Sequence, residues 1–241
     1  SFFNNALVPF LDRYADSGVL WAIDCLNEPE AMTAGADANY EDWGVTWAEM
    51  RAFLAACADY VHLYSDLPVS AGSGWHGWDN VMAGRYSGLG FDFFDFHRYS
   101  DAPDLPSATS VGGGLPVIVG ECGQATSIWD DTLQLEATLG CFDEALAGGY
   151  QAALSWYYDF AGSTNPLAHL DDDGSWRPVI DAFTAHASTG LQTGINLAWF
   201  EGAYMHDFGP NPNYPTWTVA YDHATADAAV ADLQAQGIDL M

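Results

Sequence analysis

Lysine is absent from this 241-residue sequence, and its only basic residues are five arginines. Against these stand 33 acidic residues, which give a formal net charge of −28. A chain with this charge repels nucleic acid and anionic membranes, so we expect neither as a partner. The acidic residues are spread along the chain, as on proteins adapted to high salt, where cations screen the self-repulsion. We therefore expect a halophilic source.

Long apolar runs are also missing, since none approaches the roughly 20 residues of a membrane helix. The N-terminal residues lack the basic region and apolar stretch of a signal peptide. A mature secreted protein would lack them too, and a secreted, extracellular location is the expectation. The four cysteines are too few for a disulfide framework and form no CxxC pair, so we expect buried free thiols.

Strand-like and helix-like segments alternate along one undivided domain, residues 1–241. Helical periodicity predicts helices over residues 4–16, 45–63, 131–147, 177–186 (with Ser175 as a possible N-cap) and 224–236. Apolar runs predict strands over residues 19–26, 68–72, 91–96, 115–119, 152–156 and 195–199, with 238–241 opening a seventh. Such alternation is typical of a parallel sheet, either doubly wound or closed into a (β/α)8 TIM barrel.

Polar and aromatic side chains just past the strand ends favour the barrel. They include Asn27, Glu28, Trp75, His97, Tyr99, Glu121, Trp156 and Trp199. In a barrel these positions meet on one face, where active sites are built. No GxGxxG or P-loop follows any strand, which weakens the doubly wound, nucleotide-binding alternative.

Glu28 and Glu121 are the candidate catalytic pair because each lies at the end of a predicted strand. Two carboxylates on either side of a glycosidic bond can supply acid/base and nucleophilic chemistry. A separation of about 5–5.5 Å would imply retention of configuration and a longer one inversion. No histidine spacing such as HExxH suggests a metal, so we expect neither metal nor cofactor.

Four motifs carry a resemblance to a known group. They are "WAIDCLNEPEA", "FDFFDFHRYS", "LPVIVGECG" and "AALSWYYDF". They resemble the fourth, sixth, seventh and eighth strands of the clan A glycoside hydrolases, with family 5, the cellulase and β-mannanase family, as the nearest likeness. The four motifs occur in the family's order, and the resemblance extends over nearly the whole chain.

The resemblance implies a role for each matching residue. Glu28 would be the acid/base and Glu121 the nucleophile, while Asn27 would hold the sugar 2-hydroxyl. Tyr99 would hydrogen-bond the nucleophile, and His97 would line the site.

Aromatic residues would complete the substrate site. Trp156 would form a platform under the sugar, and Trp75 and Trp199 are further candidate sugar contacts. Simpler alternatives stay open, because His97 could be a structural histidine and Trp156 an ordinary core residue.

The order of the C-terminal segments departs from this family. Residues 193–209 resemble its first strand and loop, and 224–241 resemble its first helix and the start of its second strand. Residues 1–192 resemble the third to the eighth helix. We therefore expect a permuted strand order, 4-5-6-7-8-1 and the start of 2, with part of the barrel absent and a second chain or oligomer as one way to complete it.

The sequence thus predicts a retaining hydrolase of β-linked glycans, of β-glucan or β-mannan type, with a carbohydrate substrate. Two rivals remain. One is a carbohydrate-binding pseudoenzyme on the same barrel. The other is an unrelated α/β enzyme in which Glu28 is structural.

Overall fold

The computed structural model describes residues 2–17, 20–33, 44–74, 77–100, 104–125, 130–156, 167–171 and 173–196, with positions 231 and 235. Its strands are β1 (Ile23–Asp24), β2 (Val69–Ser70), β3 (Gly72–Ser73), β4 (Phe94–Tyr99), β5 (Val117–Gly123), β6 (Ala152–Trp156) and β7 (Gln192–Asn196). Its α-helices are α1 (Val8–Tyr14), α2 (Trp47–Tyr64), α3 (Trp78–Met82), α4 (Ala108–Gly112), α5 (Asp131–Gly148) and α6 (Ile180–His186). Short helical turns η1 (Phe3–Leu7), η2 (Ala15–Ser17) and η3 (Pro29–Met32) complete the described elements.

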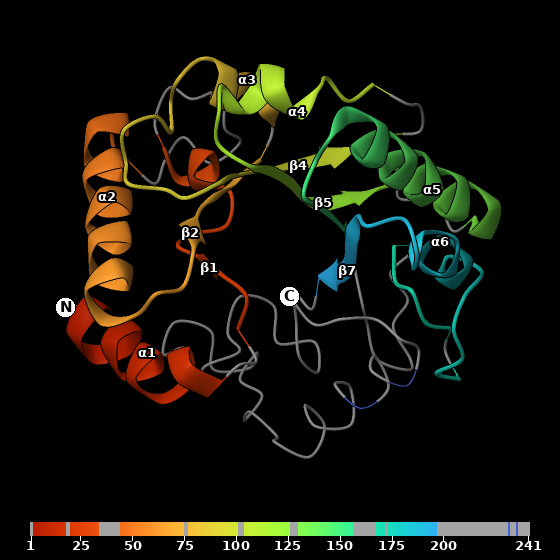
Figure 1. Ribbon diagram of the computed structural model, residues 1–241, viewed down its shortest axis with the longest axis horizontal. Coiled ribbons are helices and arrows are strands. Elements are labelled where there is room, and N and C mark those ends of the chain that lie inside the picture. The colour runs from red at the N-terminus through yellow and green to blue at the C-terminus, as the bar shows by residue number, and fades with distance from the viewer. Residues whose placement is uncertain are drawn as a thin grey trace.

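All strand pairs between these elements are parallel, and the strands adjoin one another in chain order. β1 pairs with β2, and β3 to β7 form a five-stranded sheet in sequence order. A doubly wound sheet would reverse its strand order at a switch point. Figure 1 shows the strands on the inside of an arc and the helices outside it. The fold is α/β and consistent with part of a TIM barrel.

The two long helices begin at side-chain caps. Thr46 and Glu49 form a reciprocal capping box at the start of α2, with the Glu49 N–H 3.2 Å from the Thr46 hydroxyl. Asp130 accepts the Leu133 N–H at 3.0 Å and starts α5, which ends at Gly149 in the left-handed conformation. Such caps satisfy backbone groups that the first and last turns leave unpaired. No helix in the described part of the chain is long and apolar enough to cross a membrane.

The apolar core lies mainly between the strands and the outer helices. Leu54, Val61, Phe96 and Phe142 are wholly buried there. A smaller cluster of Phe93, Ile118 and Ala152, with Ala22 packed on it, lies on the other face of the sheet. This second cluster fills the inner side near the beginnings of the strands, so polar groups on the inner side gather towards their carboxyl ends.

The four cysteines lie in two thiol pairs, each joining a strand or its end to a helix. Cys25, just after β1, is hydrogen-bonded to Cys57 of α2, and Cys122 of β5 to Cys141 of α5. All four are free, and all except the half-buried Cys141 are buried. The thiols therefore pack as small apolar groups within the outer core.

Several predicted boundaries shift. β1 covers only two residues of the strand predicted over 19–26, and Ala71 divides the strand predicted over 68–72. Phe91–Phe93 precede β4, and the Asp92 carboxylate among them accepts the N–H of Val69 in β2 at 2.9 Å. β4 and β5 end later than predicted, at Tyr99 and Gly123, so His97, Tyr99 and Glu121 lie within strands.

The C-terminal half holds further differences. α6 begins at Ile180 without a side-chain cap, and Ser175 instead hydrogen-bonds Asp173 within a turn. β7 begins at Gln192, three positions before the predicted start at 195. The predicted elements at 224–236 and 238–241 lie outside the continuously described ranges.

Helix α2 offers a test of the outer core. Leu54→Ala should lower the free energy of unfolding by about 2–5 kcal/mol, because Leu54 is wholly buried and the change leaves a cavity. Leu63→Ala, in the same helix but 72% exposed, should change it by less than about 0.5 kcal/mol. Urea unfolding measures both, and equal losses would contradict this packing.

Candidate active site

An extra residue in β5 determines where Glu121 points. Phe96 pairs with Val119 and His97 with Glu121, so β5 advances two residues where β4 advances one. The same irregularity appears against β6, between Val119 and Cys122. Such a β-bulge breaks the alternation of side chains between the two faces. It places Glu121 on the inner face, where regular alternation from the inward Ile118 would place it outside.

Gly120 occupies this bulge because no larger residue fits. A Cβ there would lie 2.2 Å from Oδ1 of the buried Asp95. Asp95, His97 and Tyr99 alternate along β4 and therefore share its inner face. His97 lies directly opposite Glu121 in the strand register. The local backbone thus brings an imidazole and a carboxylate together on neighbouring strands.

Glu28 reaches the same place from the turn after β1. Its N–H donates to the Gly72 carbonyl at 2.8 Å, which ties the turn to β3. Its φ is +46°, the one positive value among the described non-glycine residues. Such strained backbone costs about 1–3 kcal/mol and is concentrated at functional sites. Pro29 then starts η3 and turns the chain away.

His97 connects the two glutamates. Its Nδ1 lies 2.8 Å from Oε1 of Glu28 and 3.2 Å from Oε2 of Glu121. Tyr99 donates its hydroxyl to Oε2 of Glu121 at 2.7 Å. The contacting atoms of Glu28, His97 and Glu121 all lie within 4.8 Å of one another. The two carboxylates thus face a common centre.

Burial and nearby charges shift the pKa values of these groups, and for His97 and Glu121 the two effects oppose each other. For His97 burial favours the neutral ring, but Glu121, Glu28 and Asp95 together raise its pKa to about 9. Burial raises the pKa of Glu121 to about 7, although His97 and the Tyr99 hydroxyl oppose the shift. Burial and Glu121 also raise the pKa of Tyr99, so its hydroxyl stays protonated. At neutral pH His97 is therefore a cation between two acids.

Two further acids surround His97 on the inner side. Burial raises the pKa of Asp95 to about 8, despite the opposing charge of His97. Asp24, the polar interruption in the first predicted strand, accepts the N–H groups of Leu26 at 3.0 Å and Gly72 at 3.2 Å. Asp24 therefore satisfies backbone donors beside the site.

Glu28, His97 and Glu121 also form the one group in the described ranges whose ligand atoms gather closely enough for a metal ion. However, Nδ1 of His97 lies at hydrogen-bonding distance from Glu28. A metal would have to displace that hydrogen bond and compete with a protonated ring. The arrangement suits a hydrogen-bonded pair of acids better than a metal centre.

The remaining predicted site residues lie at different places. Asn27 is exposed beside Glu28. Trp156 ends β6 half-buried, and alternation puts it on the same inner face as Ala152. Trp75 and Trp199 lie outside the described residues.

Sequence reasoning missed two acids of this region, Asp95 and Glu30. Asp95 was detectable from its period-two spacing with His97 and Tyr99. Glu30 is wholly buried. Its only sequence signal is a second carboxylate in "NEPE".

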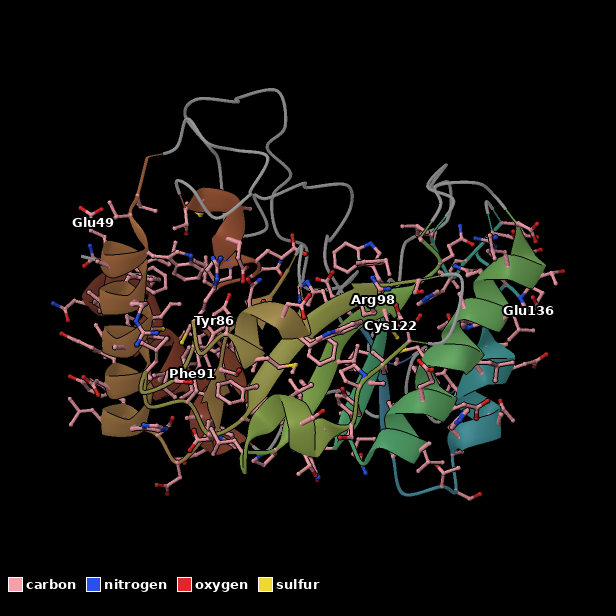
Figure 2. The ribbon with its side chains drawn as sticks, turned by 90° about the horizontal axis from the view of Figure 1, so that it is seen from above. Glu49, Tyr86, Phe91, Arg98, Cys122 and Glu136 are labelled. Carbon is pink, nitrogen blue, oxygen red and sulfur yellow. The ribbon has the colours of Figure 1, made fainter. Side chains whose placement is uncertain are left out.

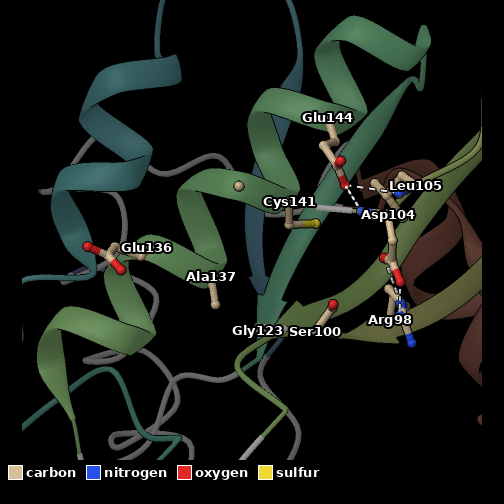
Figure 3. A pocket seen from close by; sticks show the side chains of 10 residues that line it. Arg98, Ser100, Asp104, Leu105, Gly123, Glu136, Ala137, Cys141 and Glu144 are labelled. Atoms are coloured by element: carbon tan, nitrogen blue, oxygen red, sulfur yellow. Dashed lines mark hydrogen bonds and ion pairs between the residues drawn. The ribbon is translucent and has the colours of Figure 1, made fainter. Parts of the chain in front are cut away.

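A separate hollow of about 220 Å³ lies outside the sheet, between the ends of β4 and β5 and helix α5. Figure 3 shows its walls, where Asp104 pairs with Arg98 and Glu144 accepts the N–H groups of Asp104 and Leu105. Figure 2 places Arg98 near the upper end of the strands. The residues that line the hollow do not include the inner-face glutamates Glu28 and Glu121.

Parallel strands in chain order, with carboxylates towards their carboxyl ends, define an α/β protein whose sheet is consistent with part of a TIM barrel. A solved structure of a family 39 glycoside hydrolase from the gut symbiont Bacteroides cellulosilyticus WH2 shares this fold, with a TM-score of 0.52 and 17% identity. The match covers 82% of this chain and 46% of that one, so this chain spans less than half of the neighbour's length. No protein-family model and no curated protein matches the chain.

The comparison therefore supports a glycoside hydrolase fold. It does not single out family 5, since the neighbour belongs to family 39. At this identity the likeness concerns the fold alone.

The charge of His97 can be measured directly. We expect it to titrate near pH 9 in an NMR experiment, assigned by loss of its signal in His97→Gln. In Glu121→Gln the pKa of His97 should fall, because the charge of Glu121 is the largest single contribution that favours the charged ring. A His97 pKa at or below about 6.5 in the unaltered protein would contradict the arrangement.

The raised pKa of His97 also makes the stability of the folded protein depend on pH. Because the folded-state pKa exceeds the unfolded value of about 6.5, the contribution of His97 is complete below that pH and is lost as pH rises through about 9.

Proposed function

We propose that this protein is a retaining glycoside hydrolase acting on β-linked glycans. The observation that carries the proposal is the close approach of Glu28 and Glu121, since one carboxylate oxygen of each lies within 4.8 Å of the other. Retaining enzymes hold their carboxyl groups about 5–5.5 Å apart, whereas inverting pairs need about 6.5–9.5 Å for an intervening water. The fold likeness to a glycoside hydrolase supports the same class.

In this proposal Glu121 attacks the anomeric carbon and Glu28 protonates the departing glycosidic oxygen. Glu28 then takes a proton from the water that hydrolyses the glycosyl-enzyme. Burial alone would make Glu121 the better proton donor of the two. Its contacts favour the opposite role, because Tyr99 donates its hydroxyl to Oε2 of Glu121 and the charged His97 ring forms an ion pair with the same atom. Both contacts stabilise the anion. The side chain of Glu28 is 28% exposed, which gives it the access to water that a base needs.

The binding roles are proposed from position. Trp156 shares the inner face with the acids and offers an aromatic surface to a sugar ring. Asn27 lies exposed beside Glu28 and would hydrogen-bond a sugar hydroxyl. Trp75 and Trp199 remain candidates for further sugar contacts.

We also propose that residues 1–241 form one catalytic domain with a permuted strand order. In this reading β1 corresponds to the family's fourth strand, β2 and β3 together to its fifth, β4 to β6 to its sixth to eighth, and β7 to its first. The pairing of β6 with β7 along five residues supports it, because the eighth and first strands of a closed barrel are neighbours.

Azide, added as an external nucleophile, distinguishes the nucleophile Glu121 from the acid/base Glu28. Glu121→Gln should lower hydrolysis at least about 10³-fold while folding and sugar binding persist. Added azide would then replace the missing nucleophile and give a glycosyl azide of inverted configuration. Glu28→Gln, supplied with an activated aryl glycoside, should instead give the azide of retained configuration. Product NMR distinguishes the two outcomes.

Exchanged configurations would reverse the assignment of acid and nucleophile. The broader test is a screen of β-glucans, β-mannans and aryl glycosides at low and high salt. If the unaltered protein binds but cleaves none of them, the carbohydrate-binding alternative is favoured.

The pH profile tests the environment of Glu121. We expect kcat/KM to fall on the acid side with a midpoint near pH 7, because protonated Glu121 cannot attack. His97→Gln removes a positive charge that lowers the pKa of Glu121, so the midpoint should move to higher pH. An unchanged or lower midpoint would contradict the proposed role of His97.

A further inference from the structure

Glu30 is a buried acid that the proposed reaction does not use. It lies two residues after Glu28, within the turn η3, and its side chain is wholly shielded from solvent. A buried carboxylate is unfavourable unless donors surround it. The hydrogen-bond donors around Glu30 therefore show which parts of the chain this carboxylate holds together.

Four donors from later parts of the chain converge on this carboxylate. The Ser73 hydroxyl and the Asn80 side-chain amide reach Oε1 at 2.8 and 2.9 Å, and the Tyr86 hydroxyl donates to the same atom. The Gly74 N–H reaches Oε2 at 3.2 Å. Burial and the charge of Glu30 raise the pKa of Tyr86, so its hydroxyl remains a donor. All four partners donate, which suits a carboxylate that only accepts.

Gly74 connects this network to Glu28. Glu30 holds the Gly74 N–H, and a Cβ on Gly74 would lie 2.4 Å from Cδ and 2.5 Å from Cγ of Glu28. The Gly74 backbone is thus the surface against which the Glu28 side chain rests. Glu28 has strained backbone with positive φ, so its place depends on such surroundings.

We propose that Glu30 is a positioning residue, which fixes the Glu28 carboxyl group against the site by anchoring Gly74. The inference rests on the proposed function where it concerns catalysis. Glu30 touches neither glutamate of the pair through a hydrogen bond in the described contacts, so its effect passes through backbone. A displacement of about 1 Å at a reacting group can lower a rate about 100-fold.

Glu30→Gln tests this role with little change in volume, because its amide group would present N–H to groups that are themselves donors. With substrates of poor leaving groups, kcat should fall about 10–100-fold, with KM little changed. With a dinitrophenyl glycoside and azide the defect should largely disappear. That leaving group needs no proton, and azide needs no base.

Glu49→Gln is the matched control. Glu49 is also a hydrogen-bonded acid, but it caps α2 at the outer edge of the molecule (Figure 2). This variant should leave kcat unchanged for both substrates. An equal defect in Glu30→Gln for both kinds of substrate would show general damage and overturn the inference.

A second readout is independent of catalysis. Because the Glu28 hydrogen bond helps raise the pKa of His97, displacement of Glu28 in Glu30→Gln should lower that pKa in an NMR titration. An unchanged His97 titration overturns the positioning role, whatever the activity. A lowered pKa in a protein that cleaves no glycoside supports positioning and contradicts the proposed function. If Glu30→Gln does not fold, Tyr86→Phe removes one of the four donors and should give a smaller shift in the same direction.

Discussion

The rest of the site depends on His97, whose Nδ1 is hydrogen-bonded to Glu28 and forms an ion pair with Glu121. Two carboxylates so close together repel each other, and little solvent reaches the inner face of the sheet to weaken that repulsion. His97 supplies the positive charge, since its Nδ1 lies within 3.2 Å of both acids. The strand register, the bulge in β5 and the strained turn at Glu28 all serve to bring three side chains to this point.

Because the chain has few basic residues, the positive charge of His97 beside the two glutamates matters more. Each of the five arginines is described, and each is engaged elsewhere. Arg13 lies over Tyr14 and Arg85 over Trp47, Arg51 holds backbone carbonyls, Arg98 pairs with Asp104 and Arg177 with Asp131. With no lysine in the chain, an imidazole balances the acids on the inner face. Unlike an arginine, it loses its charge within an accessible pH range.

Periodicity in the sequence was enough to predict the regular parts of the fold. The helices expected over 45–63 and 131–147 match α2 and α5 closely, and the strand over 152–156 matches β6. The site was less accessible because it depends on pairing between distant segments. Nothing in "VIVGECG" alone reveals the extra residue at Gly120, which exists only relative to β4 and β6. Likewise, the donors around Glu30 come from positions 43 to 56 residues further along the chain.

The irregularity in β5 has a consequence for how this sequence tolerates change. Side chains along a strand alternate between faces, so the count of residues between Val117 and Glu121 carries information that their identities do not. At the present count of residues, loss of the bulge would turn the acid outwards, into the helical layer. Deletion of the extra residue, Gly120, would remove the bulge and the shift together, and the acid would keep facing inwards. Among relatives of this protein, strands with and without this extra residue can therefore present the same acid to the same face.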